Sequence, residues 1–357
     1  MDVMDGHNDL PWRLRVRDPH GALDLAADLT ATGLHTDLPR LRRGGVGAQF
    51  WSVYVPDDRP EPQAAVQVVE QVELVRRIVA RHPDRLAIAT SAAEVERVRA
   101  SGRIASLLGA EGGHCIDNSL VVLRSLYKLG IRYLTLTHSR NTAWADSATD
   151  EPASGGLSPF GHEVVRELNH LGMLADLSHV ADTTMHAALD TSTAPAFFSH
   201  SSARALCDHP RNVPDDVLRR VRDTEGVVMV TFVPFFLTDE CRHWGDELYR
   251  VEDAIALPCD SPEFLRERQA WIEANPCPPT SVRDVADHVE HVREVAGVGA
   301  VGLGGDFDGT EVVPARLPDV SAYPALFDEL TARGWSEPEL RGLAWDNAMR
   351  VLRATCG

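Results

Sequence analysis

Short apolar runs alternate with helical segments along this chain, and that alternation limits its fold more than any other feature. Eight runs of strand length are rich in Val, Ile, Leu, Ala or Phe: residues 3–6, 46–54, 104–110, 131–137, 173–178, 195–199, 226–233 and 298–305. Such runs suit parallel strands buried on both faces, and strands that alternate with helices are typical of parallel α/β folds. Because eight strands with intervening helices close readily into a ring, we predict a (β/α)8 TIM barrel.

The intervals between the runs show helical periodicity. The clearest helix is expected at 158–172, where Ser158 can cap the start, Pro159 suits the first helical position and Gly172 suits the stop. A valine stripe predicts another helix between the second and third runs: Val66, Val69, Val72, Val75 and Val79. Further helices are expected at residues 119–129, 181–190, 284–296 and 337–353.

One stretch departs from this rhythm. Residues 234–280, between the seventh and eighth runs, are longer than a crossover needs and contain charged helical pieces with several prolines. We interpret them as an inserted segment or lid beside the mouth of the barrel. Neither an internal repeat nor a shift in composition marks a second domain, so residues 1–357 are expected to form a single domain.

The charge balance limits the partners of the chain. With 35 basic and 53 acidic residues, the formal net charge is −18, which repels nucleic acids and anionic membrane surfaces. No apolar stretch approaches the roughly 20 residues of a membrane-spanning helix, and the N-terminus lacks the pattern of a signal peptide. We therefore expect a cytoplasmic protein that binds neither nucleic acid nor membrane. The six cysteines include no CxxC pair, which argues against a zinc ribbon or a thioredoxin-type motif.

Residues that can bind metals follow most of the apolar runs. Barrel enzymes carry their chemistry at the carboxyl ends of the strands, which meet at one mouth. The candidates at these ends are His7, Asp9, Glu111, His138, His179, His200 and Asp306. Imidazoles and carboxylates without thiolates suit zinc or a similar divalent ion, so the pattern predicts a metal centre. We assign the remaining histidines to solvent, apart from His114 and His209: His20, His35, His82, His162, His170, His186, His243, His288 and His291.

Two neighbouring metal ions need a bridging anion. His7 and Asp9 are alternate residues of one strand, so they can grip one ion together. Some barrel hydrolases use a carbamylated lysine as the bridge, but the one lysine here, Lys128, lies on the predicted helix before the fourth strand. Glu111 is therefore the candidate bridge. His114 and Asp176 adjoin proposed ligands, and we expect them to orient those ligands.

At these positions the sequence resembles the membrane (renal) dipeptidase family, peptidase family M19, as a bacterial-type member. The likeness covers almost the whole chain, and its motifs are DGHNDLPW (5–12), EGGH (111–114), LTLTHSRNTAWADS (134–147), GLSPFGHEVVRELNHLGMLADLSH (156–179), FSHSSARAL (198–206), HPRNVPDD (209–216), VADHVEHVREVAG (285–297) and GLGGDFDG (302–309). The resemblance implies a barrel of the metal-dependent hydrolase (amidohydrolase) type. It also implies a dipeptide as substrate, and relatives suggest a homodimer.

The resemblance further implies two zinc ions per chain, with His7 and Asp9 on the first, His179 and His200 on the second, and Glu111 between them. It implies that His138 polarises the substrate carbonyl, that Arg211 binds the terminal carboxylate of the substrate, and that Asp306 shuttles the proton. Asp308 is the other candidate for the shuttle, although we rank it as a residue that supports the site from behind.

The function expected from the sequence is therefore a dinuclear zinc dipeptidase that uses a metal-bridging hydroxide, with L,D-dipeptides among its candidate substrates. One alternative is a metal-dependent amidohydrolase that acts on a lactam, a lactone or another small amide. A second is a catalytically inactive binding protein on the same scaffold. Comparing a dipeptide with its C-terminal amide tests the first alternative, and metal analysis tests the second.

Overall fold

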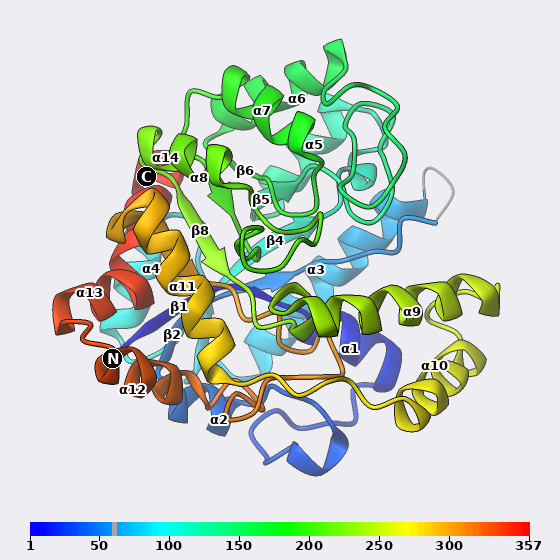
Figure 1. Cartoon of the computed structure of the whole chain (residues 1–357), viewed down its shortest axis with the longest axis vertical. Coiled ribbons are helices and arrows are strands. Elements are labelled where there is room, and N and C mark those ends of the chain that lie inside the picture. Colours follow the sequence, from blue (N-terminus) through cyan, green and yellow to red (C-terminus); the bar gives the residue numbers. More distant parts are fainter. Residues whose placement is uncertain (59–62) are drawn as a thin grey trace.

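Strand pairing closes the sheet of this protein into a barrel. In the computed structural model, which describes residues 1–58 and 63–357, nine parallel strands form one sheet in the order β2-β1-β9-β8-β7-β6-β5-β4-β3 (Figure 1). Strands β2 and β4 also pair, so eight strands form a closed ring and the predicted TIM barrel is confirmed. The ring consists of β1 (Val3–Asn8), β2 (Val46–Ser52), β4 (Ile104–Glu111), β5 (Ile131–Thr135), β6 (Leu174–Asp176), β7 (Phe197–Phe198), β8 (Val227–Val230) and β9 (Val301–Leu303).

Strand β3 (Leu86–Ile88) lies outside the ring, and the sequence pattern does not predict it. It pairs with β4, with Leu86 opposite Ile104. Leu86 is buried, whereas the other two residues of β3 are only partly buried. Three residues, of which one is buried, carry too short a pattern to be separated from the surrounding loop.

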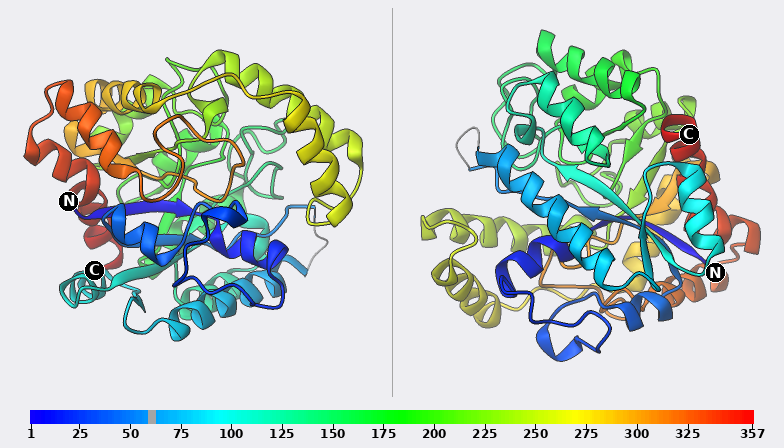
Figure 2. Two further views of the ribbon diagram at one scale, coloured as in Figure 1. Left: turned by 90° about the horizontal axis from the view of Figure 1, so that it is seen from below. Right: turned by 180° about the vertical axis from the view of Figure 1, so that it is seen from behind.

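Helices cover the outside of the ring (Figures 1 and 2). They are α1 (Leu10–Arg17), α2 (Leu38–Arg43), α3 (Gln63–Arg81), α4 (Ala92–Ala100), α5 (Leu120–Lys128), α6 (Pro159–Leu171), α7 (Asp182–Thr191), α8 (Asp215–Asp223), α9 (Asp239–Ile255), α10 (Pro262–Ala274), α11 (Val282–Ala296), α12 (Tyr323–Ala332), α13 (Glu337–Arg341) and α14 (Asn347–Cys356). Helix α6 begins and ends as predicted: the Ser158 side chain accepts a hydrogen bond from the Gly161 amide, and Gly172 adopts a left-handed conformation with φ of 71°.

The valine stripe predicted for α3 is partly wrong. Val66 and Val69 are 57% and 44% exposed, whereas the buried face carries Val68 and Val72 together with Val75 and Val79. An α-helix repeats every 3.6 residues, so a run of three-residue steps drifts off the buried face. The C-terminal helix expected at 337–353 is also interrupted, since a π-helical turn at Gly342–Asp346 separates α13 from α14.

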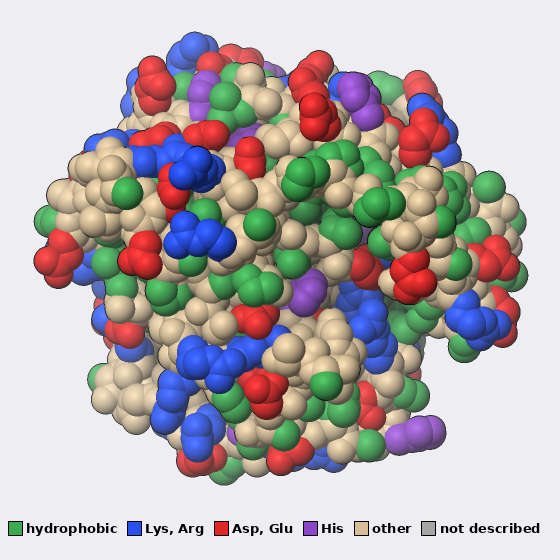
Figure 3. Space-filling view, turned by 60° about the horizontal axis from the view of Figure 1, so that its bottom comes forward, with side chains coloured by type: hydrophobic (Ala, Val, Ile, Leu, Met, Phe, Trp, Pro, Cys, Tyr) green, Lys and Arg blue, Asp and Glu red, His purple; other side chains and the backbone are tan. Residues whose placement is uncertain are grey.

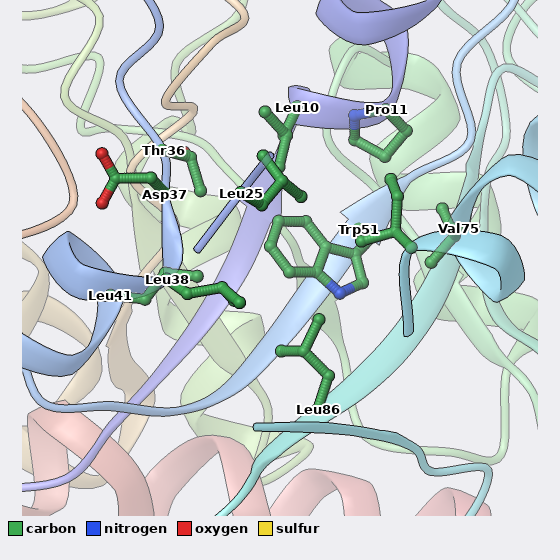
Figure 4. Close-up of a pocket in the computed structure, with 11 residues that line it drawn as sticks. Leu10, Pro11, Leu25, Thr36, Asp37, Leu38, Leu41, Trp51, Val75 and Leu86 are labelled. Atoms are coloured by element: carbon green, nitrogen blue, oxygen red, sulfur yellow. The ribbon is translucent and has the colours of Figure 1, made fainter. Parts of the chain in front are cut away.

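Apolar side chains fill the space between the ring and its helices. Figure 4 shows Trp51 of β2 together with Leu10, Leu25 and Leu86, which come from distant parts of the sequence. These residues border a cavity of about 10 Å³, which is about the space that one water molecule needs. A mostly apolar gap of this size is a feature of core packing, not a substrate site.

The inserted segment contains α9 and α10, and it lies between β8 and β9, the seventh and eighth ring strands. It projects from the side of the molecule away from the two chain termini (Figures 1 and 2). The insert has a small apolar core of its own, in which the Trp244 and Trp271 rings lie 5.5 Å apart. Within the described ranges, no helix is both long enough and apolar enough to span a membrane. Acidic and basic side chains are interspersed over the face shown in Figure 3.

Candidate metal centre

Glu111 lies at the centre of the barrel mouth. It is the last residue of β4 and is only 4% exposed. Its Oε1 atom lies 3.1 Å from His179 Nε2 and 3.5 Å from His200 Nε2. Its Oε2 atom lies 3.3 Å from His7 Nε2 and accepts a 2.8 Å hydrogen bond from the Ser52 hydroxyl. One carboxylate oxygen therefore faces His7 and the other faces His179 and His200, which suits a bridge between two cations.

A second set of ligand atoms gathers around His7, near the end of β1. Asp9 follows the strand, and its Oδ2 atom lies 3.3 Å from His7 Nε2. Strand β1 pairs with β9, so the loop after β9 brings Asp306 Oδ1 to 3.9 Å from the same nitrogen. A Cβ atom at Gly309 would lie 2.1 Å from Asp306 Oδ1 and 2.5 Å from Asp9 Oδ2, so only glycine fits there.

Hydrogen bonds orient two of the imidazoles so that Nε2 faces the mouth. The Ser199 hydroxyl donates to Asp176 Oδ2 at 2.7 Å, so its oxygen is free to accept from His200 Nδ1, 2.8 Å away. That tautomer leaves the His200 Nε2 lone pair available to a cation. His7 Nδ1 lies 2.8 Å from the Tyr133 hydroxyl and is held in the same way. Asp176 thus reaches a candidate ligand through Ser199.

Several potential ligand atoms at the barrel mouth have no hydrogen-bond partner within the described residues. Among the described residues, His7 Nε2, Asp9 Oδ1 and His179 Nδ1 are buried without a hydrogen-bond partner. The Nε2 atoms of His179 and His200 lie 3.0 Å apart. Burial and neighbouring positive charge lower the pKa of both histidines well below the usual value. Neutral imidazoles and carboxylates are the ligands that zinc prefers, so the residues fit a divalent metal.

The structure brings all five predicted metal ligands together. Three overlapping groups have ligand atoms within 4.8 Å of one another: His7, Glu111 and His200; Glu111, His138 and His179; and His7, Asp9 and Asp306. We call the five residues His7, Asp9, Glu111, His179 and His200 the metal cluster. His138 and Asp306, the two predicted catalytic residues, lie at its edges.

His138 is held at the mouth by residues on both sides. Its ring stacks on that of His179, with 4.4 Å between the ring centroids, and the centroid of the Tyr54 ring lies 4.7 Å from that of His138. Its Nδ1 atom lies 3.5 Å from Asp57 Oδ2 and 3.0 Å from the Ser139 hydroxyl. Burial opposes protonation of His138, but Asp57 and Glu111 raise its pKa above the usual value.

Arg211 is a buried cation that no described carboxylate pairs with. It is 3% exposed, and its hydrogen bonds to the His200 carbonyl and the Ser201 hydroxyl are long, at 3.4 and 3.5 Å. Its Nε atom is buried without a described partner. The guanidinium carbon lies 5.1 Å from the centre of the Phe236 ring. A buried guanidinium with free donors next to a metal cluster is suited to bind an anionic group of a ligand.

The assignment of nine histidines to solvent is mostly wrong: only His20, His170 and His243 are exposed, five others are partly buried and His288 is buried. His288 is 1% exposed, where its Nδ1 atom lies 3.0 Å from the Ala203 amide and its Nε2 atom 2.9 Å from the Leu237 carbonyl oxygen. It is a satisfied core residue that links α11 to neighbouring loops. His35 is partly buried beside Asp308, whose Oδ1 atom accepts a 2.8 Å hydrogen bond from the His35 amide. His35 lies in a loop without a periodic pattern, so the sequence did not reveal its burial. His288 lies on the buried face of α11, at helical spacing from Val285 and Val292, so the periodicity of that helix was an available signal.

Several residues that support the site were not predicted. Ser52, Tyr133 and Ser199 contact Glu111, His7 and His200, respectively, and all three lie in or at the end of an apolar run. The available signal was therefore a polar residue that interrupts a buried strand. Asp57 has no such signal, because it lies in a loop and reaches His138 only in the folded chain. His114 hydrogen-bonds to the Val55 carbonyl oxygen at 3.0 Å and does not join the metal cluster.

Comparisons with known proteins agree with this geometry. The family model described as "Membrane dipeptidase (Peptidase family M19)" matches residues 1–356. An uncharacterized dipeptidase of Schizosaccharomyces pombe, C3A11.10c, is 40% identical over 99% of this chain and 80% of its own length. Dipeptidase 3 of Rattus norvegicus is 40% identical over 98% of this chain, which spans 64% of that relative.

A solved structure supports the same assignment. The metallo peptidase of Rhodobacter sphaeroides, liganded with a phosphinate mimic of the dipeptide L-Ala-D-Ala, has a TM-score of 0.81 and 26% identity, with 99% of each chain covered. The family match therefore extends over the entire barrel and its insert, and the barrel mouth carries a set of residues suited to a metal. From these findings, the chain belongs to the membrane dipeptidase family, peptidase family M19, and is a metallo-dipeptidase.

Proposed function

We propose that this protein is a dinuclear zinc dipeptidase whose two ions are held by the metal cluster. His7 and Asp9 would hold the first ion, His179 and His200 the second, and Glu111 would bridge them. The position of Glu111 carries the proposal, because one of its carboxylate oxygens faces His7 and the other faces His179 and His200. The buried atoms without partners in the cluster supply the remaining coordination capacity.

Two zinc ions bound there would lower the pKa of a shared water and so supply a bridging hydroxide near neutral pH. His138 is placed to donate a hydrogen bond to the substrate carbonyl as negative charge develops on its oxygen. Burial and the nearby carboxylates of Asp9 and Glu111 raise the pKa of Asp306 well above its usual value. A carboxylate at the edge of the metal cluster suits a group that accepts a proton and returns it to the departing amine.

Arg211 is the proposed site for the terminal carboxylate of the substrate. A planar guanidinium can hold a carboxylate at two points, and a cation fixed near the reacting centre limits how many residues can follow the scissile bond. Dipeptides would then be preferred to longer chains. Since a relative of known structure binds a mimic of L-Ala-D-Ala, we include L,D-dipeptides among the proposed substrates.

The decisive experiment compares L,L- and L,D-dipeptides with their C-terminal amides, using zinc-loaded protein of measured metal content. The amide should lose about 10- to 100-fold in kcat/KM, because it removes a charge-assisted hydrogen bond worth about 1.5–3 kcal/mol. In the matched variant Arg211→Met, acid and amide should be hydrolysed at similar, low rates. Equal rates for acid and amide in the unsubstituted protein would contradict the role of Arg211 and favour an amidohydrolase of another substrate class.

A further inference from the structure

Glu311 joins the insert to the barrel. It lies in the loop after β9, shortly beyond Asp306. Its Oε1 atom lies 2.7 Å from Arg13 Nη1 of α1, and its Oε2 atom pairs with Arg268 of α10. The three side chains are only 12%, 16% and 17% exposed. One carboxylate therefore bridges two guanidinium groups that come from different parts of the chain, where α1 and the insert lie side by side (Figures 1 and 2).

The ion pairs continue on both sides of Glu311. Arg268 also pairs with Glu252 of α9, and Arg13 Nε donates a 2.6 Å hydrogen bond to the Asp308 carbonyl oxygen. We call the four side chains Glu252, Arg268, Glu311 and Arg13 the insert clamp. It contains two carboxylates and two guanidiniums, so its charges balance. Removing one partner of such a buried set leaves an uncompensated charge and disrupts the contact.

The loop held by the clamp has a conformation that needs support. Asp306 and Asp308 both have positive φ, 57° and 67°, which non-glycine residues adopt only where the surroundings stabilise it. Asp308 is tied to the backbone of His35 at 2.8 Å. Val312, next to Glu311, packs against the apolar core of the insert. The insert thus contacts the loop both through charge and through an apolar side chain.

The insert also borders the mouth that contains the metal cluster. Tyr249 of α9 is 40% exposed, and its ring lies 5.9 Å from that of Phe235. The neighbouring Phe236 ring lies 4.9 Å from that of Phe235 and 5.1 Å from the Arg211 guanidinium carbon. Helix α9 is therefore linked through Phe235 and Phe236 to Arg211, the group proposed to bind the substrate carboxylate.

We propose that Glu311 is a positioning residue that couples the α9–α10 insert to the loop carrying Asp306, so that each holds the other in place. Of the proposed function, this inference uses only the role of Asp306. It follows that a change made in the insert, outside the metal cluster, alters both the substrate pocket and the loop after β9.

The test is Arg268→Gln, which removes the ion pairs that Arg268 forms with Glu252 and Glu311 and leaves the Arg13–Glu311 pair. Amide hydrogen exchange of the zinc-loaded protein should accelerate in α10 and also in residues 304–312, although the substitution is not in that loop. With L-Ala-D-Ala as substrate, kcat/KM should fall about 10- to 100-fold, as expected when a catalytic group is misplaced by about 1 Å. The fall should include kcat, because Asp306 is displaced, while the zinc content stays unchanged.

Arg333→Gln is the matched control. Arg333 is 21% exposed and binds three carboxylates between α11 and α12, away from the insert: Asp287, Glu290 and Glu329. This variant should leave kcat and exchange in residues 304–312 unchanged. Faster exchange confined to the insert of Arg268→Gln, with kcat unchanged, would overturn the coupling.

If Arg268→Gln does not fold, Arg268→Lys carries the same test, since lysine keeps the charge but not the two-point contact. It should shift exchange in both α10 and the loop by a smaller amount, and an unchanged loop would again overturn the proposal. The exchange measurement does not depend on turnover, so coupling can be confirmed even if no dipeptide is hydrolysed. That second result would instead contradict the proposed function.

Discussion

The metal cluster and the insert clamp are both groups of buried charged side chains near the barrel mouth, but they are built in opposite ways. In the metal cluster, the carboxylates of Asp9 and Glu111 face imidazoles, and no described arginine or lysine pairs with them. In the clamp, each carboxylate pairs with a guanidinium. Buried acids without cationic partners indicate a place for a metal, whereas balanced ion pairs indicate a structural link.

Substituting Glu111, the proposed bridging carboxylate, should have the largest effect on activity. It should change the metal cluster and leave the insert clamp unchanged. Glu111→Gln keeps the shape of the side chain but removes the charge that two cations would share. We expect a loss of about a thousandfold or more in kcat/KM, since metal-ion catalysis supplies several kcal/mol. Metal analysis should show fewer than two ions per chain, while hydrogen exchange in the insert should not change. Full metal content with full activity would remove Glu111 from its proposed position.

Asp306→Asn should have the next largest effect, and it tests whether catalysis can be removed while the metal cluster stays intact. We expect two zinc ions per chain and a fall in kcat of about a hundredfold or more, because proton transfer by a positioned group contributes about 10²–10⁴-fold. Asp308→Asn is the matched control. Because Asp308 is engaged with the His35 backbone, its loss should cost less activity. A larger effect at Asp308 would make it the proton shuttle instead.

The sequence predicted the barrel mouth better than the insert, and the reason is physical. His7, Glu111 and His200 each follow or end an apolar run, and a closed barrel carries all such ends to one place. A polar residue at the end of one predicted strand is therefore expected to lie at the barrel mouth, beside the residues that end the other strands. Even so, Ser199 and Tyr133, which orient the histidines, were missed because they lie among the apolar residues of the runs.

The insert could be predicted as a segment but not as a set of contacts. The length of residues 234–280 indicated extra structure beside the mouth, and α9 and α10 lie there. Nothing in the local sequence of Arg268 distinguishes it from the exposed arginines nearby, such as Arg266. Its pairing with Glu311 arises from chain folding between distant segments, and no periodicity encodes such a pair. The same holds for His288, whose partners are backbone atoms of other loops.

Acidification should have the smallest effect, and it acts on the clamp through Glu311. Burial alone would raise the pKa of this carboxyl, but Arg13 and Arg268 lower it to about 2. A lowered pKa gives stability that is present above the pKa of the unfolded chain, near 4.5, and is lost as the pH falls towards 2. Burial raises the pKa of Glu252, so protonation of this second carboxyl favours the folded clamp and opposes the effect of Glu311. We therefore expect the equilibrium constant for opening of the insert to change by only about tenfold.

Pepsin cleavage between α9 and α10 measures this opening, because pepsin is active across the same pH range. In the unsubstituted protein, cleavage at residues 256–261 should accelerate as the pH falls from 4.5 to 2. In Glu311→Gln, the clamp keeps Glu252 but lacks the carboxyl that pairs with both guanidinium groups, so cleavage should be faster at pH 4.5 and should depend less on pH. If both proteins show the same pH dependence, Glu311 does not hold the insert. The ion pairs of the clamp would then not be the structural link that distinguishes it from the metal cluster.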